Sequence, residues 1–292
     1  MMDGDFVRIF EMSPRDGLQN EALPVATADK IRLVDLLSAC GFQKIEVTSF
    51  VSPKWVPQLA DAAAVFAGIH RLPGIAYAAL VPNLRGYEAA LAAGADEVAI
   101  FAAASESFSR ANINCSIAES LARFAEVMEA ARADDMPVRG YVSCAVHCPY
   151  EGAVSPSAVA EVTRALFALG CYEVSLGDTT GQGQPEAVAA MLDAVLAEAP
   201  PQKLAGHFHD TAGHAVENIR VGLGRGLRSF DASVAGLGGC PYAPGAKGNV
   251  DTRAVVGLLD RLGYVHGLDE EALAEAARFA RSLVTPAVGA TE

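Results

Sequence analysis

The sequence lacks any long apolar run. No stretch approaches the roughly 18 consecutive apolar residues of a membrane-spanning helix, and the acidic N-terminus, Met1–Asp5, lacks the basic start and apolar run of a secretory signal. A dense cysteine framework is also lacking, because the six cysteines are scattered along a 292-residue chain. Scattered cysteines of this kind are typical of reduced thiols. We therefore expect a cytoplasmic protein with no membrane partner.

The chain is short of positive charge. Its 22 lysines and arginines face 35 aspartates and glutamates, which gives a formal net charge of −13. Such a field disfavours nucleic acid as a partner, so an anionic small molecule must meet locally positive groups. The hydrophobic share of 51% allows a large core, and no linker or low-complexity segment is evident. These features predict one domain over residues 1–292.

Strand-like and helical segments alternate along the chain. Strands are predicted at 7–10, 44–48, 75–80, 97–102, 138–143, 173–176, 203–208 and 229–233, and helices at 29–40, 59–67, 84–93, 117–133, 155–169, 185–199, 215–223, 250–262 and 269–282. Thr27 is the expected N-cap of the first helix. Eight strand–helix pairs predict an α/β fold, a (β/α)8 TIM barrel with an additional C-terminal helix. A doubly wound open sheet is the alternative, but no glycine-rich dinucleotide loop follows the first strand.

Active sites of such barrels lie at the C-terminal ends of the strands. Polar residues gather at these predicted ends, whereas charged groups elsewhere are confined to helix faces. They include Glu11, Arg15, Asp16, Gln19, Glu46, Ser175, Asp178, His207, His209, Cys240 and Asn249. A ring of carboxylates, imidazoles, an arginine and a thiol suits metal-assisted chemistry.

The pair His207 and His209 is the most suggestive pattern within this ring. Residues i and i+2 of a strand point to the same side, so both imidazoles could bind one divalent cation. On spacing alone, two unrelated histidines at a strand end are the more common case. Asp16 could likewise cap a loop, and Asn249 could be an ordinary helix N-cap. The metal assignment therefore depends on the rest of the chain.

Four segments resemble a known family: Ser13–Glu21, Thr48–Trp55, Gly140–Cys144 and Ser233–Tyr242. They closely resemble the 3-hydroxy-3-methylglutaryl-CoA lyases, and the resemblance extends over nearly the whole chain. The cysteine-bearing glycine loop is specific to that family, while the Arg-Asp-Gly and His-x-His patterns also occur in isopropylmalate, homocitrate and citramalate synthases. The resemblance implies cleavage of 3-hydroxy-3-methylglutaryl-CoA to acetoacetate and acetyl-CoA, as in leucine catabolism. It also implies an acyl-CoA substrate and a possible homodimer.

The resemblance further implies a ligand set. Asp16, His207 and His209 would bind a divalent cation, with Asn249 as a further ligand. This mixture of oxygen and imidazole donors suits Mg²⁺ or Mn²⁺, with Zn²⁺ or Co²⁺ as chemically possible substitutes.

The reaction needs a metal at the tertiary hydroxyl, a positive group at the enolate oxygen and an acid for the enolate carbon. Arg15 suits the second task because its guanidinium stays charged, although an isolated arginine is commonly a surface ion pair. Cys240 suits the third, because a thiol with a pKa near ~8.5 can donate a proton. A lone cysteine is otherwise often a small core residue, but the flanking glycines argue against that here. The base stays open between Asp16, His207 and a water on the metal.

Supporting roles are also predicted. An inward Glu46 is costly unless paired, so it should hold Arg15 or the metal site. Asp178 is a second supporting carboxylate of the catalytic group, with an ordinary turn aspartate as the alternative. Substrate contacts are predicted for Arg15, Gln19, Ser175, Asn112 and Ser116, the last two toward coenzyme A.

Three other functions are considered. A lyase for a longer 3-hydroxy-3-substituted glutaryl-CoA is the nearest alternative. An acyl-CoA condensing synthase is less favoured, because the cysteine loop would then lack a purpose and the additional regulatory region is absent. A catalytically silent barrel acting as a binding protein is disfavoured, because such a barrel has no need of so many costly groups at one rim.

Overall fold

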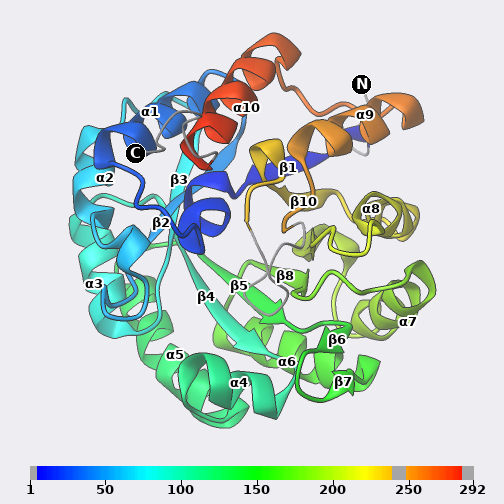
Figure 1. Cartoon of the computed structure of the whole chain (residues 1–292). Coiled ribbons are helices and arrows are strands. Elements are labelled where there is room, and N and C mark those ends of the chain that lie inside the picture. Colours follow the sequence, from blue (N-terminus) through cyan, green and yellow to red (C-terminus); the bar gives the residue numbers. More distant parts are fainter. Residues whose placement is uncertain (1–4, 239–247, 285–292) are drawn as a thin grey trace, which may run out of the picture.

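The computed structural model describes residues 5–238 and 248–284. Within these ranges, eight parallel strands close into a barrel in the order β1-β10-β9-β8-β5-β4-β3-β2 (Figure 1). They are β1 (Arg8–Glu11), β2 (Lys44–Ser49), β3 (Ala76–Leu80), β4 (Glu97–Ala103), β5 (Val138–Ser143), β8 (Glu173–Asp178), β9 (Leu204–Phe208) and β10 (Ser229–Ala232). The predicted (β/α)8 TIM barrel is confirmed.

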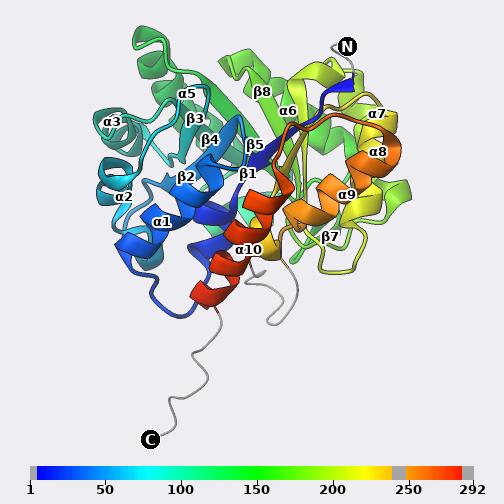
Figure 2. The same ribbon diagram turned by 90° about the horizontal axis from the view of Figure 1, so that it is seen from above.

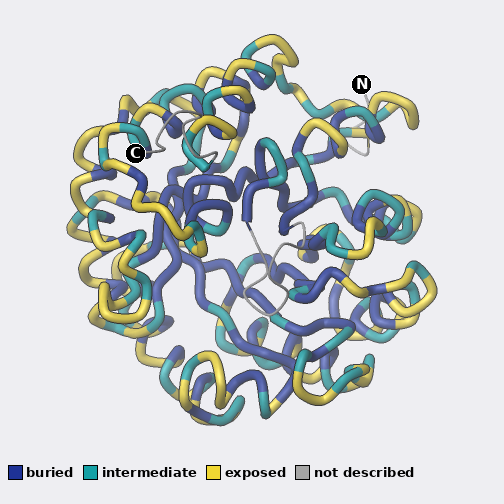
Figure 3. The backbone as a smooth tube through the Cα atoms, viewed as in Figure 1, coloured by how far each residue is buried: buried dark blue, intermediate teal, exposed yellow. Residues whose placement is uncertain are grey.

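Helices cover the outside of the barrel. They are α1 (Thr27–Ser38), α2 (Ala62–Gly68), α3 (Leu84–Ala92), α4 (Glu106–Ile113), α5 (Ile117–Ala133), α6 (Pro156–Leu169), α7 (Pro185–Leu196), α8 (Ala215–Gly224), α9 (Thr252–Leu262) and α10 (Glu270–Val284). Figure 3 shows the strands buried at the centre and the exposed positions on the outer faces of the helices. None of the described helices combines the length and the apolar character needed to cross a bilayer.

The predicted additional C-terminal helix is α10, which packs beside α1 (Figure 2). At this contact the Arg32 guanidinium lies 4.5 Å from the centre of the Phe279 ring. The contact closes the outer layer where the first and last parts of the described chain meet. Helix α10 also contacts the turn Val234–Gly236, which follows β10.

Local signals set several helix ends. Ser116 caps α5 through a capping box with Glu119, and Gly170 follows α6 in the left-handed region, with φ 112°. The prediction that Thr27 is the N-cap of α1 is wrong. Ala26 occupies that position, and the Thr27 hydroxyl donates to Asp61 at 2.7 Å instead of capping the helix.

Three local elements were missed or misplaced by the sequence reading. The stretch after β4 forms α4, capped by the Ser105 side chain, where no helix is predicted. A two-stranded hairpin, β6 (His147–Cys148) and β7 (Gly152–Ala153), follows β5. Helix α2 begins only at Ala62, because Pro57–Leu59 form a separate 3₁₀ turn.

Candidate active site

A short π-helical turn after β1, Ser13–Gly17, carries the first site residues. Glu11 holds this turn in place. Its Oε1 accepts hydrogen bonds from the backbone N–H groups of Ser13 (3.0 Å) and Val234 (2.9 Å), and its Oε2 accepts one from the Thr252 hydroxyl (2.7 Å). Burial raises the pKa of Glu11 to about 6 despite these hydrogen bonds. Glu11 therefore joins the first strand to segments that follow the last one.

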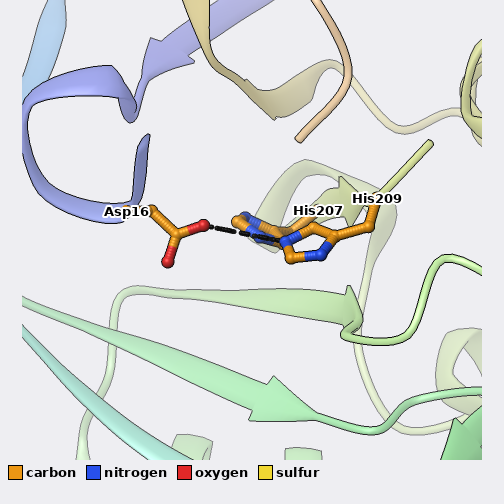
Figure 4. A group of neighbouring side chains, drawn as sticks. All are labelled: Asp16, His207 and His209. Carbon is orange, nitrogen blue, oxygen red and sulfur yellow. Dashed lines mark hydrogen bonds and ion pairs between the residues drawn. The ribbon is translucent and has the colours of Figure 1, made fainter. Parts of the chain in front are cut away.

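Asp16, His207 and His209 converge at the mouth of the barrel, and Figure 4 shows their side chains facing one another. Asp16 Oδ2 lies 3.8 Å from Nε2 of His207 and 3.7 Å from Nε2 of His209, and the two Nε2 atoms are 3.2 Å apart. Phe208, between the histidines, is part of the apolar core. The structure thus places both imidazoles on one side of the strand end. One carboxylate oxygen and two imidazole nitrogens this close together form a donor set that fits a divalent cation.

Asn249 is brought to this cluster by an isolated bridge with His209. Its Nδ2 donates to Asp16 Oδ2 (2.7 Å) and to the Leu237 carbonyl (3.1 Å). Asn249 is not the N-cap of α9, since Asp251 occupies that position. The amide nitrogen therefore orients Asp16, and a role for the amide oxygen as a metal ligand stays a prediction.

Arg15 lies beside the cluster in a buried ion-pair network. Its Nε donates to Glu46 Oε2 and its Nη1 to Asp16 Oδ1, each at 2.5 Å. Burial raises the pKa of Glu46, whereas the pKa of Asp16 is well below its usual range, because Arg15 and the two histidines outweigh the effect of burial. The structure therefore places Glu46 in contact with Arg15, as the sequence predicts, and fixes the guanidinium in orientation.

A cavity of about 990 Å³ opens above these groups. Its lining includes Arg15, Gln19 and Asn112, for which substrate contacts stay predictions, together with Tyr141. The outer part of the lining includes Trp55, whose side chain is 75% exposed. The cavity thus connects a polar inner end to a more open rim, a shape suited to a long ligand whose reactive end lies inside.

Ser175, Asp178 and Ser116 are among the predicted residues that lie outside this lining. The Ser175 hydroxyl donates to Asp231 Oδ2 (2.8 Å) below the cluster, and Asp178 Oδ2 accepts from the backbone N–H of Gly183 (2.8 Å). Ser116 is engaged in its capping box with Glu119. In this structure their observed contacts are internal, so substrate contact by Ser175 and Ser116 and the supporting role of Asp178 stay predictions.

Cys240 and most of its glycine-rich loop lie outside the described residues. The described parts on either side, Gly236–Gly238 and Gly248–Asn249, lie next to the cluster. The backbone N–H of Asp210 donates to the Gly248 carbonyl at 2.7 Å. The role of the thiol as proton donor stays a prediction.

Sequence reasoning missed three buried polar residues below the cluster. Asp231 Oδ2 lies 3.1 Å from Nδ1 of His207, and the same carboxylate accepts from both terminal nitrogens of Arg139, at 2.7 and 3.0 Å. The Tyr141 hydroxyl accepts from Arg139 (2.9 Å) and donates to Glu46 Oε1 (3.2 Å). Burial raises the pKa of Asp231, but the Arg139 charge and the His207 contact together bring it to about 2. A signal existed, because Arg139 and Asp231 are charged residues within strand-like runs, as Glu46 is.

Fold and cluster together define a class of protein: a (β/α)8 barrel with a carboxylate–imidazole site of metal-binding type at the C-terminal mouth. Within that class the family is specific. The sequence model of the HMGL-like family matches residues 6–280, and the chain belongs to this family. The family is metal-dependent, and its known reaction is the cleavage of 3-hydroxy-3-methylglutaryl-CoA to acetoacetate and acetyl-CoA.

Relatives of known name agree with this placement. The chain is 59% identical over 270 residues to a 3-hydroxy-3-isohexenylglutaryl-CoA/hydroxy-methylglutaryl-CoA lyase of Pseudomonas aeruginosa, covering 92% of this chain and 90% of the relative. It is 57% identical over 273 residues to the mitochondrial hydroxymethylglutaryl-CoA lyase of Gallus gallus, covering 94% and 92%.

Solved structures agree with this placement as well. The HMG-CoA lyase of Brucella melitensis superposes with a TM-score of 0.95 at 62% identity, covering 96% of this chain and 99% of that one. An HMG-CoA lyase of Acinetobacter baumannii, solved with coenzyme A and 3-methylmalate, gives a TM-score of 0.92 at 38% identity, covering 97% and 93%.

Proposed function

We propose that this chain cleaves 3-hydroxy-3-methylglutaryl-CoA to acetoacetate and acetyl-CoA, with Mg²⁺ or Mn²⁺ bound by Asp16, His207 and His209 and with Asn249 as a further ligand. The observation that carries the proposal is the convergence of these side chains beside Arg15 at the inner end of the cavity. Zn²⁺ and Co²⁺ suit the same donors chemically. Bound there, a divalent cation polarises the hydroxyl and carboxylate oxygens of the substrate and lowers the pKa of the hydroxyl.

The side chains at the mouth of the barrel have separate proposed roles in the reaction. Asp16 and a water on the metal are the candidates that would accept the hydroxyl proton. His207 suits this task less well, because its Nε2 would bind the cation while its Nδ1 faces Asp231. As the C2–C3 bond breaks, C3 becomes the ketone of acetoacetate and the bonding electrons pass to C2, which leaves the enolate of acetyl-CoA. Arg15, held between Glu46 and Asp16, faces the cavity as a fixed positive charge for the enolate oxygen. A proton from the Cys240 thiol to C2 completes acetyl-CoA.

Two measurements test this function. Release of acetoacetate should stop when a chelator removes the metal and return when Mg²⁺ or Mn²⁺ is added back. Substituting Cys240→Ser should lower turnover by orders of magnitude while Mn²⁺ binding stays intact. Turnover that is unchanged in this variant excludes the thiol as proton donor. Metal binding without any acetoacetate release from the wild type would instead favour a catalytically silent barrel.

A longer substituent at C3 is the second candidate substrate. The cavity volume of about 990 Å³ and its apolar lining residues Leu80, Phe101 and Phe108 favour it, as does the name of the Pseudomonas aeruginosa relative. A series of 3-hydroxy-3-alkylglutaryl-CoA esters, compared by kcat/KM, decides between the substrates. A steady fall of kcat/KM with each added methylene would restrict the chain to the methyl compound.

The acyl-CoA partner, the homodimer and the cytoplasmic location belong to the same proposal. The five described cysteines are free thiols, which agrees with a reducing compartment. Light scattering of the purified chain tests the homodimer, since a monomer and a dimer differ twofold in mass.

A further inference from the structure

We propose that Asp231 is the positioning residue of the cluster: it fixes the ring orientation and the tautomer of His207, and so sets the affinity of the site for a divalent cation. The inference rests on the proposed metal-binding role of the cluster. It concerns a carboxylate that lies below the cavity and outside its lining, so Asp231 would act through His207 rather than through the substrate.

Strand register brings the two residues together. Asp231 on β10 is paired with His207 on the neighbouring parallel strand β9. Side chains of paired residues in adjacent strands project to the same face, here into the barrel. Asp231 is only 1% exposed, and its Oδ2 lies 3.1 Å from Nδ1 of the imidazole. Two strands of the barrel wall, rather than a flexible loop, therefore define this contact.

The other contacts of Asp231 determine which atom carries the hydrogen. Arg139 donates to both carboxylate oxygens, at 2.7 and 3.0 Å, and the Ser175 hydroxyl donates to Oδ2 at 2.8 Å. A carboxylate that already accepts three hydrogen bonds from such donors has no proton to offer and takes a fourth. Nδ1 of His207 must then be the donor, and its hydrogen points to Asp231.

With the hydrogen on Nδ1, Nε2 is the ring atom left to bind a cation. That atom faces the cluster, 3.8 Å from Asp16 Oδ2 and 3.2 Å from Nε2 of His209. The ring is thus preset to donate electrons to a cation before one arrives. A carboxylate behind a metal-bound histidine typically contributes a factor of about 10–100 to metal affinity by this means.

His209 provides an internal contrast. Its Nδ1 is buried and makes no hydrogen bond with the described residues. Of these two imidazoles, therefore, only that of His207 has a hydrogen-bond partner at its Nδ1 among the described residues. Loss of the Asp231 carboxylate should therefore disturb the ring of His207 directly, and that of His209 only through the 3.2 Å contact between the two Nε2 atoms.

The first test measures Mn²⁺ binding to the purified full-length protein by electron paramagnetic resonance of the free ion. Asp231→Asn should weaken binding by about 10- to 100-fold. Glu173→Gln is the matched control, because Glu173 Oε1 also accepts a hydrogen bond from buried Arg139 (2.7 Å) but has no contact with His207. Its affinity should stay within about threefold of wild type. Equal losses in both variants would reduce Asp231 to a general structural role, and unchanged affinity in folded Asp231→Asn would overturn the proposal.

The second test needs no binding. Long-range ¹H–¹⁵N correlation spectra of histidine-labelled, metal-free wild type, assigned with a His207→Gln variant, report the tautomer directly. The hydrogen should be on Nδ1 of His207; a hydrogen on Nε2 would overturn the proposal. Because this readout is independent of metal, a wild type that binds no Mn²⁺ would refute the proposed function while the tautomer still decides the role of Asp231.

A milder variant covers the case in which Asp231→Asn fails to fold. Ser175→Ala removes only one hydrogen bond to Oδ2 and should lower Mn²⁺ affinity by about two- to fivefold. High Mn²⁺ should restore the lost turnover of either variant, because a weakened site can be filled by mass action. Turnover that stays low at saturating Mn²⁺, with normal affinity, would contradict a positioning role.

Discussion

Glu11 offers a sharp test of how the loop after β1 is held. Its carboxylate is fully buried and accepts hydrogen bonds from the backbone N–H groups of Ser13 and Val234 through Oε1 and from the Thr252 hydroxyl through Oε2. A glutamine can keep all three contacts, since its oxygen accepts from the two N–H groups and its NH₂ donates to the threonine oxygen. Glu11→Gln therefore removes the ionisation of this site with little change in packing.

The magnitude follows from the pKa. Burial raises it from 4.5 to about 6 in the folded chain. The folded state thus holds its proton to higher pH than the unfolded state, so the contribution to stability is fully present below pH 4.5 and is lost as pH rises through 6. This difference in pKa corresponds to a loss of about 2 kcal/mol in unfolding free energy by pH 8. More than half of that loss occurs between pH 5 and pH 8.

Urea unfolding of wild type and Glu11→Gln at several pH values between 5 and 8 measures this effect. Taking the difference in unfolding free energy between the two proteins removes the contributions of the other titrating groups. This difference should change by about 1 kcal/mol in favour of the variant as pH rises from 5 to 8. Parallel stability profiles would refute the reasoning, because they would mean that ionising the buried carboxylate costs nothing. A Glu11→Gln protein that becomes less stable relative to wild type as pH rises would show that the folded state favours the ionised carboxylate.

Three further predictions concern the site and its rim. Arg15→Lys should lower kcat for acetoacetate release by about 10²-fold or more, because one ammonium group cannot keep the contacts to both Glu46 and Asp16; a kcat within twofold of wild type would exclude Arg15 from enolate stabilisation. Coenzyme A should change the emission of Trp55, the single tryptophan, because that side chain lies at the cavity rim, and acetoacetate alone should not; emission unchanged at saturating coenzyme A would place the ligand elsewhere. Ser105→Ala should destabilise the chain by about 1 kcal/mol in urea unfolding, because it removes the side-chain cap of α4; unaltered stability would show that the cap contributes nothing.

Much of the barrel could be predicted from sequence because its signals are local. Apolar runs of strand length alternate with helical spacing, and residues such as Gly170 and Ser116 mark helix ends through their own backbone or side chain. Helix α4 was missed because its sequence, Glu106–Ile113, is polar and short, so its periodicity is weak and only the Ser105 cap announces it. Thr27 is the opposite case, a cap predicted where none exists. Local rules make its hydroxyl a helix cap, but the hydroxyl donates to Asp61, which is distant in the sequence.

In the candidate site, too, some features could be predicted from the sequence and others could not. The placement of Asp16, His207 and His209 at one mouth follows from strand ends and from the i, i+2 rule, which are local features combined with one assumption of fold. The partners of Ser175 and Asp231 depend on which strands are neighbours and in what register, and no local pattern contains that information. Charged residues inside strands could be recognised from sequence as unusual, but their contacts could not be assigned.

The buried charged residues around Arg139 favour a catalytic barrel over a catalytically silent one. Replacing buried ion pairs by apolar side chains is often neutral or stabilising, so stability alone does not account for a fully buried Arg139. Two series of contacts lead from this arginine. One passes through Asp231 to His207, and the other passes through Tyr141 and Glu46 to Arg15. Both end at the mouth of the barrel, at the two groups that the proposed reaction needs in fixed orientation, and a scaffold that binds without catalysis has no use for that convergence.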